Sequence, residues 1–91
     1  MGAIEQTVTI TNKVGLHARP ATLFVQTAAR YSASVRARCG SREADAKRIL
    51  EVLQLGAAQG ATLTISAEGT DASEAVSALV ALVQNNFGEE E

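Results

Sequence analysis

The stretch TLTISAE, residues 62–68, alternates polar and apolar side chains along its whole length. Successive side chains of a β-strand point to opposite faces of a sheet, so this alternation predicts a strand with one buried side. A similar pattern recurs at residues 33–39 and, with many β-branched residues, at residues 4–10. Strands with one polar side each predict an antiparallel sheet that is covered on one face and open to water on the other. The side chains expected to face inward are those of Ile4, Val8, Ile10, Ala33, Val35, Ala37, Leu63, Ile65 and Ala67.

A turn and a short return strand are expected after residue 39. Cys39, Gly40 and Ser41 form a turn signal, which predicts that residues 42–44 come back as a fourth strand. Cys39 is in register with the inward-facing residues before it, so we expect a small core-facing residue at a strand end. One cysteine and one histidine do not make a metal site, and no metal is expected.

The first helix is expected to start at Pro20, the only proline of the chain. Proline suits a first helical position, because its missing N–H would have no intrahelical partner there. The apolar or small residues that follow with helical spacing are Ala21, Leu23, Phe24, Ala28 and Tyr31. They predict an amphipathic helix lying on the sheet.

Two further helices complete the predicted fold. One is expected to follow Asp45 as its N-cap and to stop near Gly56. The other is expected to run from Asp71 to about Asn86, with Glu74 completing a capping box. The sequence thus predicts an α+β open-faced sandwich of order βαββαβα, in which three helices cover one face of a four-stranded antiparallel sheet.

Length, composition and charge limit the class of protein. The 91 residues, 46% hydrophobic and 20% charged, suit one compact domain over residues 1–91. The net charge is −2, so nucleic acid is not an expected partner. The acidic C-terminus, residues 88–91, is expected to be a short solvated tail. One cysteine, no secretory signal pattern and no apolar run of ~20 residues predict a cytoplasmic protein without direct membrane insertion.

The segment GLHARPA, residues 15–21, contains the only histidine. If Pro20 is at or next to the first helical position, His17 and Ala18 lie at the N-terminus of the helix, where backbone N–H groups lack acceptors and the helix dipole favours anions. Arg19 adds a permanent charge whose planar donors match phosphate oxygens. An imidazole nucleophile, free amides and a guanidinium would then surround one phosphoryl group, and phosphoryl transfer needs little besides such positioning. No water-holding carboxylate is evident nearby, which suits a group that is passed on and not hydrolysed.

A less specific interpretation assigns no chemistry to this segment. A single histidine before a helix is often only a capping or surface residue, and most exposed arginines are simply solvated. The chain would then be a non-catalytic α/β interaction module. It is the combination of His17, Arg19 and Pro20, and none of them alone, that favours phosphoryl chemistry.

Nearly the whole chain resembles one known family. Residues 15–21 are similar to the active-site signature of HPr, the histidine-containing phosphocarrier of the bacterial phosphoenolpyruvate-dependent sugar phosphotransferase system. The other stretches that resemble the family in order and spacing are VTIT at 8–11, ADAKxI at 44–49, LGAxxG at 55–60 and LTISAEG at 63–69. The family fold is an open-faced sandwich of four antiparallel strands under three helices, in agreement with the elements predicted above.

The resemblance implies roles for the residues of the motif. His17 would accept a phosphoryl group on Nδ1 from enzyme I and give it to the IIA component of a sugar permease, with no cofactor. Arg19, together with the backbone N–H groups of Ala18 and Arg19, would support the phosphoryl oxygens. Such a protein is a phosphoryl-transfer intermediate more than a stand-alone enzyme. The motif does not separate a carrier for sugar uptake from a paralogue in a nitrogen-regulatory phosphorelay.

Two positions depart from the family. HPr proteins of many low-GC Gram-positive bacteria carry a regulatory serine where this chain has Arg48, so phosphorylation by the HPr kinase at this position is excluded. Many members also have a small polar residue just before the glycine of the motif, where this chain has Val14. We expect a modest effect of Val14 on the transfer rate, with transfer intact.

Residues 49–55, ILEVLQL, carry five apolar side chains in seven positions, more than a short helix on a sheet can bury on one face. Val52 and Leu55 are expected to pack inward. The residues of the expected docking surface are Ile49, Leu50 and Leu53, with Arg19, Lys47 and Arg48 around them. The resemblance places partner contacts there, and an apolar centre with a basic rim suits partners with an acidic surround. The alternative is a fully buried short helix with incidental charges.

A monomer is expected, because a carrier must show the same face to successive partners.

Overall fold

A computed structural model describes residues 3–89 of the chain. The elements in chain order are β1 (Ile4–Thr9), α1 (Ala18–Ala28), β2 (Ser34–Cys39), β3 (Arg42–Asp45), α2 (Ile49–Gln54), β4 (Thr62–Glu68) and α3 (Ala72–Gln84), followed by the short 3-10 turn η1 (Asn86–Gly88). The predicted order βαββαβα and the α+β fold class are confirmed. The short fourth strand predicted after Ser41 is β3.

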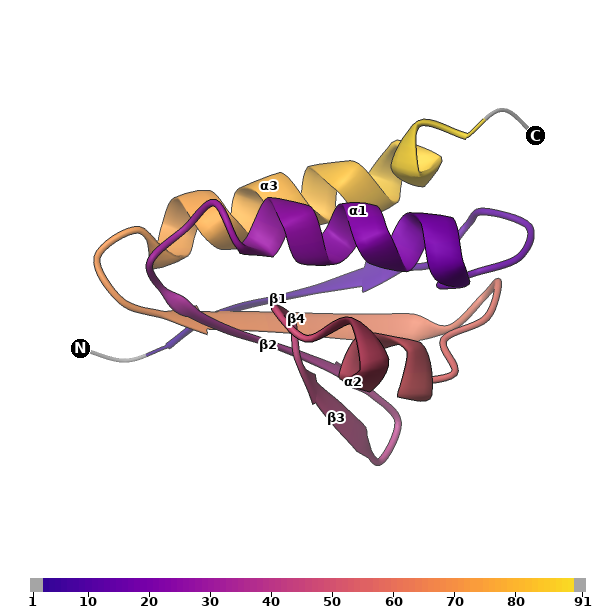
Figure 1. The fold of residues 1–91 in the computed structure, drawn as a ribbon, viewed down its shortest axis with the longest axis horizontal. Coiled ribbons are helices and arrows are strands. Elements are labelled where there is room, and N and C mark those ends of the chain that lie inside the picture. The colour runs from indigo at the N-terminus through magenta and orange to yellow at the C-terminus, as the bar shows by residue number, and fades with distance from the viewer. Residues whose placement is uncertain (1–2, 90–91) are drawn as a thin grey trace.

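The four strands form one antiparallel sheet in the order β1-β4-β2-β3 (Figure 1). In this register Ile65 of β4 lies opposite Gln6 of β1 and Ala37 of β2. A slip of one residue would turn the apolar side chains of β4 toward the open face, so their alternation fixes the register against both neighbours. The strand over residues 62–68 therefore organises the sheet from its interior.

Burial follows the predicted alternation except at the start of β1. The inward-facing apolar side chains predicted within residues 33–39 and 62–68 are buried, and so are Val8 and Ile10. The prediction for Ile4 is wrong, because its side chain is 41% exposed. Ile4 is the first residue of an edge strand, which has a neighbour on one side only.

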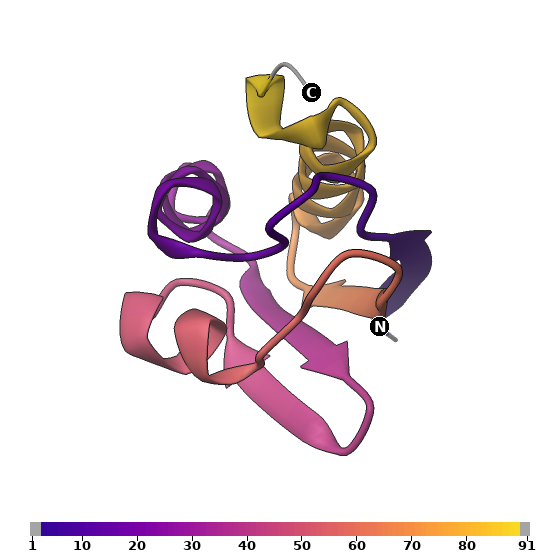
Figure 2. The ribbon, with the colours of Figure 1, turned by 90° about the vertical axis from the view of Figure 1, so that its right-hand side faces the viewer.

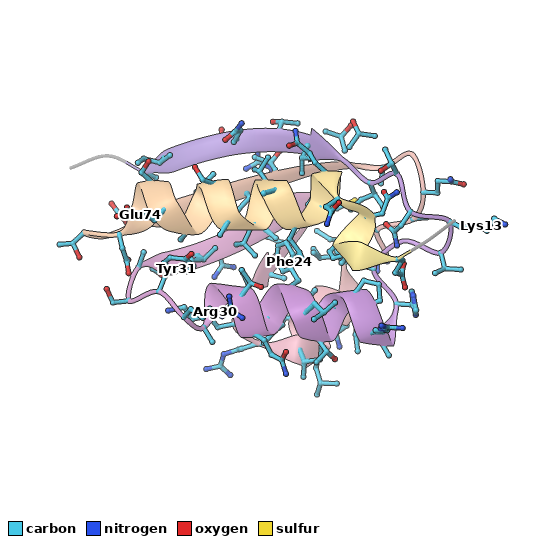
Figure 3. All side chains as sticks on the ribbon, turned by 90° about the horizontal axis from the view of Figure 1, so that it is seen from above. Lys13, Phe24, Arg30, Tyr31 and Glu74 are labelled. Carbon is cyan, nitrogen blue, oxygen red and sulfur yellow. The ribbon has the colours of Figure 1, made fainter. Side chains whose placement is uncertain are left out.

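Helices α1 and α3 lie side by side on the covered face, and α2 lies beside α1 near β3 (Figure 2). Phe24 of α1 is fully buried between α1 and α3 (Figure 3). Burial of one such side chain contributes about 1.5–3 kcal/mol. The buried side chains of α3 are those of Ala72, Ala75, Val76, Leu79, Val80 and Val83.

Among residues 3–89, no helix combines the length and the hydropathy that a membrane crossing requires.

The second helix starts later than predicted. Asp45 is the last residue of β3 and not an N-cap; Arg48 occupies the cap position of α2. The Asp45 side chain accepts the N–H of Lys47 at 2.9 Å, and its own N–H donates to Glu51 at 2.9 Å. This local turn takes up the carboxylate that would otherwise have capped a helix. The helix ends next to Gly56, as predicted.

The predicted capping box at α3 does not form. Asp71 occupies the N-cap position but makes no side-chain cap hydrogen bond, and Glu74 is exposed. The Asp71 carboxylate instead accepts the N–H groups of Ser32 and Ala33, both at 2.8 Å. The bond from Ser32 holds the pKa of Asp71 below its ordinary value of 3.8, and the bond from Ala33 acts in the same direction. Asp71 thus ties the start of α3 to the entry of β2.

Candidate functional site

The segment before α1 is held against the loop that follows α2. The N–H of Leu16 donates to the carbonyl oxygen of Ala57 at 2.9 Å, and the Leu16 side chain is buried. Gly15 has a φ of +66°, and a Cβ at this position would lie 2.3 Å from the Ala57 oxygen. Glycine alone permits both the backbone angle and the close approach. These contacts fix the point from which His17 emerges.

His17 is the N-cap residue of α1, with φ −84° and ψ −170°. The helix begins at Ala18, so the predicted start at Pro20 is two residues too late. A proline is accepted inside the first turn because the N–H groups there have no intrahelical acceptor. The first helical hydrogen bond runs from the N–H of Ala21 to the carbonyl oxygen of His17 at 2.9 Å. The His17 ring itself makes no capping bond and is 42% exposed.

The N-terminus of α1 presents unpaired donors beside this ring. No residue between 3 and 89 accepts the backbone N–H of Ala18 or Arg19. The positive end of the dipole of this eleven-residue helix lies at the same place. The Arg19 side chain is exposed, and within the described part of the chain it forms no ion pair. The arrangement can hold a small anion next to His17.

A carboxylate that the sequence did not reveal lies against the histidine. The Oε2 atom of Glu89 is 3.3 Å from Nε2 of His17, across 72 positions of sequence. The Glu89 side chain is only 16% exposed, and its Oε1 accepts a bond from the side-chain amide of Asn12 at 3.2 Å. Glu89 is therefore not part of a solvated tail, and the expectation of no carboxylate near the imidazole is wrong. Residues 90–91 of the predicted tail lie outside the described residues.

A tight C-terminal turn carries Glu89 to this position. Helix α3 ends at Gln84, earlier than the predicted Asn86, and both Asn86 and Phe87 have positive φ angles of 52° and 55°. Asparagine tolerates such an angle, whereas for a bulky residue such as Phe87 it costs on the order of 1–3 kcal/mol. The Phe87 side chain is buried in the core, and the Thr11 hydroxyl donates to the side-chain oxygen of Asn86. These two anchors hold the turn in its strained shape.

The apolar residues of α2 and its C-cap are buried to different degrees. Val52 and Leu55 are buried, whereas Leu50 is 70% exposed. Ile49 and Leu53 are partly buried against the core. The alternative of a fully buried helix is therefore wrong. A second large apolar side chain, Val14, is 58% exposed in the segment that leads to His17.

The two basic residues predicted beside this surface lie before α2 and not within it. The Lys47 ammonium donates to the carbonyl oxygen of Tyr31 at 2.7 Å, which joins this turn to the segment after α1. Arg48 has a 72% exposed side chain and makes loose ion pairs with Asp45 at 3.6 Å and Glu51 at 3.8 Å. Arg48 is thus available at the surface, while the Lys47 ammonium is engaged in a structural contact.

Cys39 is a half-buried free thiol packed against the core. Among residues 3–89 there is no group of three or more His, Cys, Asp or Glu side chains that could hold a metal ion.

Fold and site together define a class of protein, an α+β open-faced sandwich with an exposed histidine at the N-terminus of its first helix. Residues 4–85 match the family model described as PTS HPr component phosphorylation site. The phosphocarrier protein HPr of Pseudomonas aeruginosa is 45% identical over 92 residues, covering 100% of both chains. The HPr of Cupriavidus necator is 41% identical over 88 residues, covering 97% of this chain and 99% of its own.

A solved structure agrees over nearly the same extent. HPr-C-His from Thermoanaerobacter tengcongensis superposes with a TM-score of 0.93 and 46% identity, covering 97% of this chain and 99% of that chain. The chain belongs to the HPr family, the phosphocarriers of the phosphotransferase system.

Proposed function

We propose that His17 is the phosphoryl acceptor of this phosphocarrier and that its reactive atom is Nδ1. The observation that carries the proposal is the position of the ring, which is 42% exposed and uses neither nitrogen to cap α1, beside two backbone N–H groups that are free within residues 3–89. Nε2 is occupied by the contact with Glu89, which leaves Nδ1 as the nitrogen available to a phosphoryl group.

The transfer step needs no metal or cofactor in this proposal. The Nδ1 lone pair attacks phosphorus, a new N–P bond forms, and the bond from phosphorus to the donor breaks with its electron pair returning to the donor atom. In this proposal the amides of Ala18 and Arg19, at the N-terminus of α1, and the Arg19 guanidinium stabilise charge on the phosphoryl oxygens. Onward transfer is the same step in reverse, with the phosphorus attacked by the next acceptor.

Enzyme I is the proposed donor, and IIA proteins or domains are the proposed acceptors. We infer that both dock on Ile49, Leu50 and Leu53, with Arg19 and Arg48 supplying positive charge at the rim. The exposed Leu50 and the partly buried Ile49 and Leu53 support an apolar centre for this surface. A monomer working in the cytoplasm is the form in which one face can meet partners in turn.

Incubation with phosphoenolpyruvate and enzyme I tests the proposal. The protein should acquire one phosphate that is labile in acid and stable in alkali, as expected for a phosphorus–nitrogen bond. His17→Ala should acquire none while keeping its fold by circular dichroism. Labelling of the His17→Ala variant, or failure of the wild-type chain to be labelled, would contradict the assignment.

A further inference from the structure

We propose that Glu89 is a positioning residue for His17, which holds the ring proton on Nε2 and thereby keeps the lone pair on Nδ1. The inference concerns the geometry of the unmodified protein, and its consequence for phosphoryl transfer rests on the function proposed above. Glu89 lies outside residues 15–21 and comes from the other end of the chain, so the histidine motif alone does not reveal it.

The chemistry of the two partners determines which atom carries the proton. An ionised carboxylate only accepts hydrogen bonds, so the 3.3 Å contact between Oε2 of Glu89 and Nε2 of His17 requires an N–H on Nε2. In a neutral imidazole the other nitrogen then holds the lone pair. The contact thus selects the tautomer that can attack phosphorus through Nδ1.

The carboxylate is held in place through its second oxygen. Oε1 of Glu89 accepts the side-chain N–H of Asn12 at 3.2 Å, and the same amide nitrogen donates to the carbonyl oxygen of Gly15 at 2.8 Å. Asn12 is completely buried, which makes it a rigid support. One buried amide therefore links the backbone of the histidine segment to the carboxylate that orients the ring.

The C-terminal turn at residues 86–88 positions Glu89 next to His17. Asn86 and Phe87 both adopt left-handed backbone angles; asparagine tolerates this conformation, but a bulky side chain such as that of Phe87 avoids it unless the surroundings enforce it. The buried Phe87 side chain fixes the turn two residues before Glu89.

A second effect follows when Nδ1 becomes phosphorylated. The attack uses the Nδ1 lone pair, so a ring that keeps its Nε2 proton carries a positive charge, and Glu89 already faces that proton. The carboxylate lies at the nitrogen that does not react, away from the bond that forms at Nδ1. We therefore expect Glu89 to stabilise the phosphorylated form through this ion pair.

The tautomer is measured by NMR of 15N-labelled imidazole in the unphosphorylated protein, at a pH where the ring is neutral. The wild-type chain should show the Nε2–H form. Glu89→Ala should shift both nitrogen signals toward a mixture of tautomers, whereas Glu89→Gln, whose amide oxygen can still accept, should restore most of the wild-type pattern. Glu74→Gln removes one carboxylate at the opposite end of the molecule and should change nothing (Figure 3). Identical nitrogen shifts in wild type and Glu89→Ala would overturn the inference.

A second experiment measures the charge effect independently of the tautomer. It determines the equilibrium constant of phosphoryl transfer from phosphorylated enzyme I to the carrier. Both Glu89→Ala and Glu89→Gln lack the negative charge, so both should lower the equilibrium constant about two- to fivefold, the range expected for a partly exposed ion pair. An unchanged constant in both variants would refute the ion pair. If the wild-type chain accepted no phosphate at all, the proposed function would fail, while the NMR comparison would still decide the role of Glu89.

Discussion

Gly15 and Ala57 approach so closely that the backbone of one leaves no space for a side chain on the other. A Cβ at Gly15 would lie 2.3 Å from the Ala57 carbonyl oxygen, and the φ of Gly15 is +66°. This contact places His17 relative to the loop after α2, which makes it a structural requirement of the site.

We expect Gly15→Ala to destabilise the protein by on the order of 2 kcal/mol and to slow phosphoryl transfer. Gly40→Ala is the matched control, because Gly40 has a similar φ of +62° and a Cβ at that position would meet no other atom within 4 Å. Urea unfolding of both variants separates the cost of the backbone angle from the cost of the clash. Equal losses of stability would show that the contact with Ala57 is unimportant.

Arg19→Ala should reduce the rate of phosphoryl transfer roughly ten- to a hundredfold, because a hydrogen bond to a charged group contributes about 1.5–3 kcal/mol. Its free energy of unfolding should change by less than about 0.5 kcal/mol, since the side chain is exposed and unpaired within residues 3–89. Arg19→Lys should recover part of the rate, because the charge remains and the planar fork is lost. Rapid-quench kinetics with phosphorylated enzyme I give the rate. A parallel loss of rate and stability would argue against a direct contact with phosphate.

Leu50→Asp should weaken docking to enzyme I, raising the carrier concentration needed for half-maximal transfer roughly tenfold. The side chain is 70% exposed, so stability should be nearly unchanged. Ile49→Asp should also slow transfer. Because Ile49 is partly buried against the core, this substitution disturbs packing as well as docking. Ser77→Asp places the same charge on the exposed side of α3 and serves as the control. Wild-type saturation behaviour in Leu50→Asp would remove α2 from the proposed interface.

The Asp71 carboxylate should make stability depend on pH in acid. Its pKa is lowered in the folded state by the hydrogen bonds from Ser32 and Ala33, so its stabilising contribution is complete above the ordinary value of 3.8. That contribution is lost as the pH falls through the lowered pKa of the folded protein. The stability difference between wild type and Asp71→Asn should therefore shrink below pH 3.8, as measured by urea unfolding across the acid range. A difference that stays constant with pH would contradict this account.

Local periodicity was sufficient to predict which segments form strands and helices and where α3 begins, but not where α1 and α2 begin or what the capping side chains bind. Asp45 and Asp71 both have the residue type of an N-cap, yet each carboxylate is engaged elsewhere. Asp45 accepts a bond within its own turn, and Asp71 bonds to a segment 38 and 39 positions earlier. Capping preferences describe isolated helices, and here turn and tertiary partners compete with them for the same oxygens.

The candidate site could be predicted as far as it is contiguous in sequence. His17, Ala18 and Arg19 follow one another, so the start of a helix is enough to bring them together. Glu89 reaches His17 only through the left-handed turn at Asn86 and Phe87; an asparagine is compatible with such a turn, but a phenylalanine gives no local signal for it. The acidic composition of the C-terminus indicated a solvated tail, and tertiary folding gave one of its residues a different position.

Because the C-terminal turn brings Glu89 into contact with His17, Glu89 and the start of β1 differ as attachment points for a tag. Strand β1 starts at the opposite end of the molecule from the N-terminus of α1 (Figure 1). A tag or fusion attached directly to Glu89 would start at a residue whose carboxylate is 3.3 Å from the imidazole, whereas one attached directly to Ile4 would start at the far end of the sheet.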